Sequence, residues 1–201
     1  MEILVGKQSR FISADDLLHR MNSSIRGVTV DLGTGDGKFV LHEARREPGQ
    51  FVVGIDACRE NLHAAARGAP GNALFAIANA CSLPRELMGL ADRVIINFPW
   101  GSLRDGLLCA EPELLAGLRL MARPRAALEV RLNASALAEA DWTLDAGANQ
   151  AADVLRSAGV RVRSVRRLGA AELRACPTTW ARRMAFGRNP EAVEILGRFD
   201  G

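Results

Sequence analysis

A glycine-rich turn between acidic side chains is the strongest chemical signal in this sequence. The apolar run 28–32 contains Asp31 and leads through Gly33, Gly35 and Asp36 into a helical pattern. Glycines permit the sharp turn and the close approach of backbone to ligand that nucleotide-binding βα turns require. A second apolar run ends in Asp56, about twenty residues after the glycine turn, where an acid binds the two ribose hydroxyls of an adenosyl group.

The charge of this turn distinguishes two classes of ligand. A pyrophosphate binds to free N–H groups at a helix start, and Asp31 and Asp36 would repel it. An aminoacyl sulfonium ligand instead brings an ammonium group, which Asp31 can accept through a charge-assisted hydrogen bond. The acids therefore favour S-adenosylmethionine, with Asp31, Gly33, Gly35, Asp36 and Asp56 as binding residues. The alternative is a generic βαβ pair in which the aspartates are only capping residues.

Two tryptophans stand beside turn-forming residues. Trp100 follows Pro99 at the end of the apolar run 93–97, and Trp180 follows Pro177 and two threonines. The end of a strand in an open α/β sheet is where such a fold presents its reacting group, and two indoles can hold a base taken out of its stack. An Asn or Asp followed by two prolines and an aromatic, typical of amino-group methyltransferases, does not occur at this strand end. The alternative is that either tryptophan is an ordinary core residue.

Composition predicts one globular domain over 1–201. The chain is 48% hydrophobic and 24% charged, a balance that supports one substantial core. Its net charge is only +3, yet segment 156–188 holds nine arginines and one acid, Glu172. Clustered arginine is typical of nucleic-acid binding, and a solvated face of strands and loops is the equal alternative on composition alone.

The cysteines and the hydropathy exclude several classes. The four cysteines form no CxxC pair and only three histidines occur, so we expect no metal site and reduced, buried cysteines. No stretch approaches the roughly 18 apolar residues of a membrane span, and the opening residues do not resemble a signal peptide. We therefore expect a cytoplasmic protein without a membrane or metal partner.

Alternating periodicity predicts an α/β fold with a mostly parallel, seven-stranded Rossmann-like sheet. An N-terminal hairpin (1–12) and a helix capped by Ser13 come first. Segment 133–150, small and acidic, is interpreted as a linker and lid. Segment 182–197 is expected to return as a hairpin-like antiparallel element. The remaining elements are expected as strands 28–32, 51–56, 74–78, 93–97, 126–132 and 160–168, and as helices 38–46, 59–67, 111–122 and 149–157.

Several of these segments together resemble the Kam and Npm aminoglycoside-resistance enzymes, over nearly the whole chain. The likeness is carried by the opening Val5-Gly6-Lys7 and by segments 31–37, 54–56 with 59–62, 82–84 with 86–87, 98–103 and 180–188. Those enzymes are class I S-adenosylmethionine-dependent methyltransferases that modify N1 of adenine 1408 in 16S rRNA of the 30S subunit. The resemblance implies the same reaction here, with kanamycin- and apramycin-type resistance, by a monomer.

The resemblance also implies roles for individual residues. Trp100 and Trp180 would hold the flipped adenine, and Thr178 would order the loop or the base. Further cofactor contacts would come from Ala80, Cys81 and Pro99. The resemblance implies that Arg183 and Arg188 contact rRNA phosphate, and we expect Arg182, with Arg67 as a minor contributor, to belong to the same RNA-binding face.

Three segments depart from the family pattern. Segment 64–72 is short and carries only Arg67, where the resistance enzymes have a longer, lysine-rich linker; Cys81 replaces a glutamate beside the cofactor adenine; and 133–150 is shortened. Each lost phosphate contact would weaken docking. The sequence therefore leaves two alternatives open: a cofactor-binding relative that docks on RNA with little or no catalysis, and a small-molecule methyltransferase.

Overall fold

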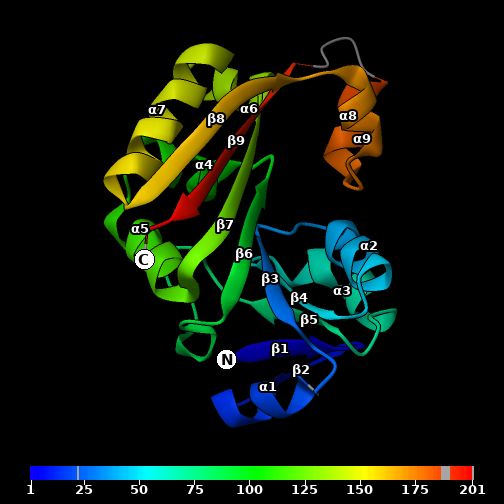
Figure 1. Cartoon of the computed structure of the whole chain (residues 1–201). Coiled ribbons are helices and arrows are strands. Elements are labelled where there is room, and N and C mark those ends of the chain that lie inside the picture. The colour runs from blue at the N-terminus through cyan, green and yellow to red at the C-terminus, as the bar shows by residue number, and fades with distance from the viewer. Residues whose placement is uncertain (22, 187–190, 201) are drawn as a thin grey trace.

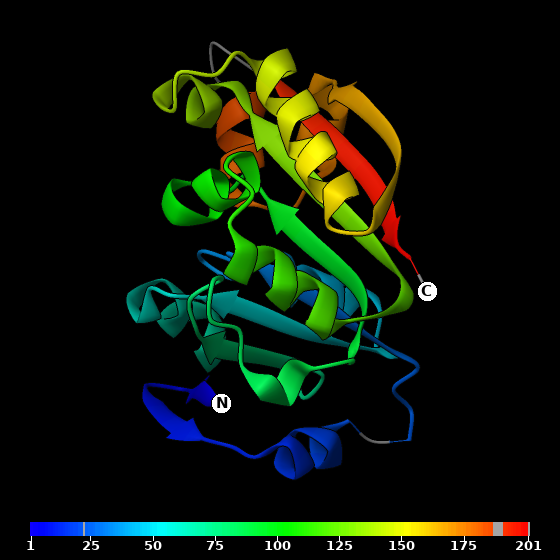
Figure 2. The ribbon, with the colours of Figure 1, turned by 90° about the vertical axis from the view of Figure 1, so that its left-hand side faces the viewer.

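The computed structural model describes residues 1–21, 23–186 and 191–200, which form one mixed sheet covered by helices (Figures 1 and 2). The sheet order is β2-β1-β5-β4-β3-β6-β7-β9-β8. The strands are β1 Glu2–Val5, β2 Gln8–Phe11, β3 Gly27–Leu32, β4 Gln50–Asp56, β5 Ala73–Ile77, β6 Ala91–Asn97, β7 Ala122–Asn133, β8 Val160–Leu168 and β9 Ala192–Phe199.

Helices cover both faces of this sheet. One apolar core joins α1, α4, α5, α6 and α7 to one face, while a second joins α2 and α3 to the other, and a third lies under α8 and α9. The helices are α1 Ala14–Arg20, α2 Lys38–Arg46, α3 Arg59–Arg67, α4 Gly101–Leu108, α5 Pro112–Met121, α6 Ala134–Glu139, α7 Leu144–Ser157, α8 Ala170–Ala175 and α9 Thr179–Ala185, with a 3-10 turn at Arg85–Leu87.

The centre of the sheet is parallel, and this arrangement positions the site. Strand β3 lies between β4 and β6, parallel to both, and β5 and β7 continue the sheet outward in parallel. After β3 the chain passes to β4, which lies on one side of β3, whereas β6 and β7 lie on the other side of β3. The carboxyl ends of β3 and β6 therefore flank a topological switch point, where open α/β sheets bind ligands.

The predicted number of seven strands in the sheet is wrong, because the described residues form a sheet of nine strands. The N-terminal hairpin does form, with Glu2 opposite Phe11, and it extends the sheet instead of standing apart from it. Strand β1 pairs antiparallel with β5 through Ile3 and Leu4, both of which are buried. An apolar strand beside an open sheet edge pairs with it because the edge would otherwise leave N–H and C=O groups unpaired.

The prediction for 182–197 is wrong in its first part. Residues up to Ala185 belong to α9, and only Ala192–Phe199 returns as a strand, while 187–190 lie outside the described residues. Strand β9 is antiparallel to β7 and β8 and lies between them. Helix α9 forms because the Thr178 hydroxyl accepts a hydrogen bond from the Ala181 N–H at 3.0 Å, which caps its first turn.

The segment interpreted as a linker is helical over most of its length. Segment 133–150 contains α6 and the first half of α7, which begins at Leu144 and not at residue 149. The Thr143 hydroxyl accepts from the Ala146 N–H at 3.2 Å and so starts the helix. Trp142 packs partly buried against the main core. No residue of 133–150 is among the described residues that line the candidate site, so the lid remains a prediction.

Two of the four cysteines also depart from expectation. Cys176 is buried and Cys81 is partly buried. Cys58 and Cys109 are exposed, because Cys58 caps the N-terminus of α3 and Cys109 caps the C-terminus of α4. All four are free thiols. In the described part of the chain, no helix is long and apolar enough to cross a membrane.

Candidate active site

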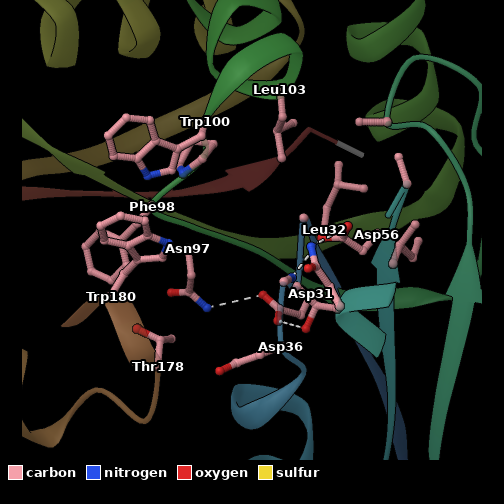
Figure 3. Close-up of a pocket in the computed structure, with 18 of the residues that line it drawn as sticks. Asp31, Leu32, Asp36, Asp56, Asn97, Phe98, Trp100, Leu103, Thr178 and Trp180 are labelled. Carbon is pink, nitrogen blue, oxygen red and sulfur yellow. Dashed lines mark hydrogen bonds between the residues drawn. The ribbon is translucent and has the colours of Figure 1, made fainter. Parts of the chain in front are cut away.

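A cavity of about 580 Å³ opens at the carboxyl ends of β3, β4 and β6 (Figure 3). Its floor is the glycine turn after β3, and Gly33 there has φ +73°. A Cβ on Gly33 would lie 2.6 Å from a methyl group of Leu103, so the turn has room for glycine alone. The turn therefore holds its backbone against the cavity, as the sequence pattern predicts.

Asp31 lies at the bottom of this cavity with 1% of its surface exposed. Its carboxylate accepts hydrogen bonds from the Thr34 hydroxyl at 2.5 Å and from Asn97 Nδ2 at 3.2 Å. Burial outweighs these two bonds and raises the pKa of Asp31 to about 6. A buried carboxylate with only uncharged hydrogen-bond donors is a strong acceptor for a cationic ligand group.

Asp56 holds the two loops that frame the opposite side of the cavity. Its carboxylate accepts hydrogen bonds from the Gly35 N–H at 2.8 Å and the Cys58 N–H at 2.9 Å, and from Asn61 Nδ2 at 3.4 Å. The carboxylate is thus fixed beside the glycine turn, at the end of β4 (Figure 3). A carboxylate in this position is available to ribose hydroxyls.

Asp36 makes a contact that the sequence does not reveal. It accepts a hydrogen bond from the Thr179 hydroxyl at 2.5 Å and pairs with Lys38 Nζ at 2.9 Å, and Lys38 in turn donates to Thr179 at 2.7 Å. These bonds hold the pKa of Asp36 below its usual value despite partial burial. They fasten the start of α9 to the glycine turn, so the helix that carries Trp180 is attached to the ligand-binding floor.

The two tryptophans come together above Asn97, although 80 positions separate them (Figure 3). Their ring centroids lie 5.1 Å apart with an interplanar angle of 28°. Trp100 stands at the start of α4, and Trp180 belongs to the first turn of α9 and not to a loop. Trp180 is 39% exposed, and Trp100 Nε1 is buried without a hydrogen-bond partner among the described residues. The two indoles therefore lie together, as the sequence predicts, but they stack on each other.

The turn that presents Trp100 is held under strain. Phe98 has φ +52°, a conformation that non-glycine residues rarely adopt. Its side chain is 2% exposed and packs with Leu173, Ala181 and Met184 beneath α8 and α9. Packing of this kind stabilises unfavourable backbone at functional sites, so the same small core that supports Trp180 also sets the direction of Trp100.

A network of ionic contacts on the sheet holds Asn97, which in turn donates a hydrogen bond to Asp31. Arg131 Nη1 donates to Asn97 Oδ1 at 2.8 Å, so both ends of the Asn97 carboxamide are occupied. Arg131 also pairs with Glu129 and Glu194, each at 3.0 Å. The sequence did not predict this network. Its signal in the sequence is a partial alternation of charge along β7, at Arg123, Arg125, Glu129 and Arg131 but not at Ala127, and such alternation is usually associated with a solvated strand face.

The other residues predicted to bind the cofactor differ in whether they line the cavity. Gly35, Ala80 and Pro99 line the cavity, as does Thr178 from the cap of α9. Cys81 is not among the described lining residues, because it turns away and packs partly against the core. Its pKa is raised, mainly by burial.

The predicted RNA-binding arginines divide into two groups. Arg183 lines the cavity mouth with its guanidinium carbon 5.4 Å from the centre of the Trp180 ring, and Arg182 lies exposed beside it on α9. Arg67 is exposed at the end of α3 and donates to the His63 carbonyl. Arg188 lies outside the described residues.

The arginine-rich segment 156–188 is only partly a free cationic surface. Arg166 pairs with Glu172 and Glu194, and Arg167 with Asp145 and Glu191. These ion pairs belong to the sheet and its helices. Arg156 and Arg161 are paired with acids as well. Among the described arginines of the segment, those without an acidic partner are Arg163 on β8, Arg174 on α8, and Arg182 and Arg183 on α9, and of these only Arg183 lines the cavity.

Comparison with known proteins gives consistent matches over the whole chain. A family model described as NpmA, 16S rRNA (adenine(1408)-N(1))-methyltransferase, matches residues 2–199. The chain is 30% identical over 215 residues to the 16S rRNA (adenine(1408)-N(1))-methyltransferase of Escherichia coli, with 98% of each protein covered. It is 34% identical over 225 residues to the protein of the same description from Streptoalloteichus hindustanus, with 100% of each covered.

Solved structures agree with these matches. The crystal structure of the 16S rRNA methyltransferase KamB superimposes with a TM-score of 0.88 at 28% identity, over 100% of both chains. A mutant 16S rRNA (adenine(1408)-N(1))-methyltransferase from Catenulisporales acidiphilia, solved with its cosubstrate SAM, superimposes with a TM-score of 0.86 at 25% identity, over 100% of this chain and 97% of that one.

Proposed function

Because the chain belongs to the NpmA family of 16S rRNA (adenine(1408)-N(1))-methyltransferases, we propose that it transfers a methyl group from S-adenosylmethionine to N1 of adenine 1408 in the 30S subunit. The observation that carries the proposal is the pair of stacked tryptophans directly above a pocket floored by a buried aspartate. Any methyltransferase needs a pocket that binds S-adenosylmethionine. An enzyme that acts on a flipped base also needs side chains that hold the base, and the two indoles can do so.

The pocket fits the methyl donor by its charge. Three aspartates line it, and Arg183 is the only basic side chain among its described lining residues. Asp31 would accept the ammonium group, and Asp56 the ribose hydroxyls. Once bound, S-adenosylmethionine supplies an electrophilic methyl group. A pyrophosphate ligand would instead meet three carboxylates, which disfavours the dinucleotide alternative.

Positioning of the base falls to Trp100 and Trp180. A base between two aromatic faces needs about 7 Å from ring to ring, since each stacking contact spans about 3.5 Å. The centroids are 5.1 Å apart, so the indoles must separate before an adenine can enter. Trp180 is the more exposed ring and stands on a helix of only seven residues, and it is therefore the ring that we expect to move.

The arrangement favours attack by N1 over attack by the exocyclic amino group. Neutral adenine has a lone pair at N1, so in-line attack needs positioning and a dry pocket but no general base. No histidine, lysine or glutamate is among the described residues that line the pocket. Asn97, at the position where amino-group methyltransferases activate their substrate, already uses its Oδ1 to accept from Arg131. The cationic N1-methyl product also stacks well against indole faces.

The partner of the proposed reaction is 16S rRNA in the assembled 30S subunit. Arg183 lines the pocket and Arg182 is exposed next to it on α9, and neither has an acidic partner in the described part of the chain, which suits contact with phosphate. Arg67 and Arg188 are proposed as further contacts. We propose a cytoplasmic monomer that works without a metal ion and whose product confers kanamycin- and apramycin-type resistance.

The test is methyl transfer to purified 30S particles. Label from S-adenosylmethionine should enter 16S rRNA, and reverse transcription should stop at position 1408, because an N1 methyl group blocks the pairing edge of adenine. Asp31→Asn and Trp100→Ala should reduce the stop strongly. Label at another nucleotide, or in wild-type protein no label at all while S-adenosylmethionine binds normally, would overturn the proposal in favour of a non-catalytic relative or another substrate.

A further inference from the structure

A second, basic groove lies between α2 and the start of α9. It encloses about 450 Å³ and is lined by Lys38, Leu41, His42, Arg45, Arg46, Pro177 and Arg182. Five of these seven side chains are lysine, arginine or histidine, and no acid is among the described residues that line it. Nothing in the sequence pattern drew attention to α2, because its arginines are interleaved with apolar residues in an ordinary amphipathic helix.

The geometry of α2 explains how the groove obtains its charge. The helix buries Phe39, Val40 and Ala44 against the sheet. Side chains on its other side must therefore face solvent. His42, in the middle of the helix, and Arg45, near its C-terminal end, are both exposed.

Not all of the basic side chains are free to bind a ligand. Arg46 pairs with Glu43 at 3.1 Å and lies 3.7 Å from Glu47, and Lys38 pairs with Asp36. Arg45 donates to the Gly68 carbonyl at 3.4 Å, and neither it nor Arg182 has an acidic partner in the parts of the chain that the structure describes. Two uncompensated guanidinium groups at the two sides of a groove are suited to bind anionic oxygens.

The groove is continuous with the mouth of the active site. Arg182 is adjacent in sequence to Arg183, which contacts Trp180, and the Lys38 ammonium group donates to the Thr179 hydroxyl. At the other end, Arg45 lies beside Gly68, which directly follows Arg67. A cationic path therefore runs from the indoles along α2 to the end of α3, on the same side of the molecule (Figure 1).

We propose that this groove binds the phosphodiester backbone of 16S rRNA near the target nucleotide, and so supplies the contact that the short, lysine-poor segment 64–72 lacks. The inference rests on the proposed function and adds a site to it. Charge selects nucleic acid as the partner, because a protein interface needs aromatic or aliphatic anchors, whereas Leu41 and Pro177 are the only apolar residues among the described lining.

The experiment compares Arg45→Gln with Arg119→Gln in binding to 30S particles over a series of salt concentrations. Arg119 is exposed on α5, which covers the other face of the sheet, so both variants lose one positive charge and only one loses it in the groove. One phosphate contact contributes about 0.7–0.9 to the slope of log affinity against log salt. At 0.1 M salt, this is an affinity loss of about five- to eightfold. We expect Arg45→Gln to show this loss of affinity for 30S and a shallower salt slope, and Arg45→Glu to show a larger loss. Arg119→Gln should keep the affinity and the slope of the wild type.

The possible results are distinct. Equal affinities and slopes in the Arg45 and Arg119 variants would overturn the groove as a binding site. Weaker binding with an unchanged slope would show a contact with ribosomal protein and not with phosphate, which also refutes the inference. Calorimetry with S-adenosylmethionine checks that each variant keeps a folded active site. If wild-type protein binds 30S without methylating it, the proposed function fails. The 30S affinities and salt slopes of the Arg45 and Arg119 variants still decide whether the groove binds phosphate.

Discussion

Replacement of Asp31 by asparagine should change both the pH dependence of folding and the binding of S-adenosylmethionine. Burial raises the pKa of Asp31 from 3.8 to about 6. The folded protein therefore holds this proton more tightly than the unfolded chain does. The stabilising contribution is fully present below about pH 4 and is lost as the pH rises through 6. Between pH 4.5 and 7.5, the free energy of unfolding should fall by about 2 kcal/mol through this group alone.

The Asp31→Asn side chain cannot ionise, so the variant should lack this decrease. Its amide would face the Asn97 Nδ2 donor, a mismatch that costs stability at every pH and therefore cancels in the difference between two pH values. Urea unfolding at pH 4.5 and 7.5, followed by tryptophan fluorescence, measures the difference. Asp153→Asn, at an exposed site on α7, is the control and should retain the wild-type pH dependence.

The same substitution should weaken cofactor binding. Loss of a charged hydrogen bond costs about 1.5–3 kcal/mol, and the wild-type affinity should fall further below pH 6 as Asp31 takes up its proton, whereas the variant should show no such pH dependence. Calorimetry between pH 5 and 8 measures both effects. If wild type and Asp31→Asn lose stability equally between pH 4.5 and 7.5, and bind the cofactor equally, Asp31 is not the buried ionised acceptor described here.

Three further predictions concern the indoles, the RNA surface and the α9 attachment. Trp100→Ala and Trp180→Ala should each lower the methylation rate about ten- to a hundredfold, since stacking contributes about 1–3 kcal/mol per base, with unchanged cofactor affinity by calorimetry; a sharp loss of melting temperature with normal specific activity would instead make them core residues. Arg183→Glu should abolish 30S pelleting but not cofactor binding, and normal pelleting would remove α9 from the RNA surface. Thr179→Val breaks the contact with Asp36 and should raise KM for 30S more than it changes cofactor affinity; identical steady-state constants would show that the contact does not position α9.

Local chemistry made much of this fold predictable. Helices 38–46 and 59–67 have the bounds that their apolar spacing indicates, and the Ser13 cap is present with Asp16 as its partner. Asp31 and Asp56 also lie where the strand-and-turn pattern puts them, because each is at the carboxyl end of a buried parallel strand.

Long-range pairing was out of reach of the same reasoning. The N-terminal hairpin was not included in the predicted seven-stranded sheet, because nothing in 1–12 indicates that β1 pairs with β5. Helix α9 was missed because its seven residues are held by a small core with Phe98 and by the Asp36 contact, which lies 143 positions away. Ionic contacts such as Arg131 with Asn97 depend on strand register, which charge patterns do not specify.

The most direct test of the central claim uses two preparations of 30S subunits, one with adenine and one with guanine at position 1408 of 16S rRNA. Guanine carries a hydrogen on N1 and has no lone pair there to attack a methyl group. After incubation with the protein and S-adenosylmethionine, nucleoside mass spectrometry should find N1-methyladenosine in the adenine subunits and no methyl transfer to the guanine subunits. Equal methylation of both preparations, or N6-methyladenosine as the product, would contradict the account.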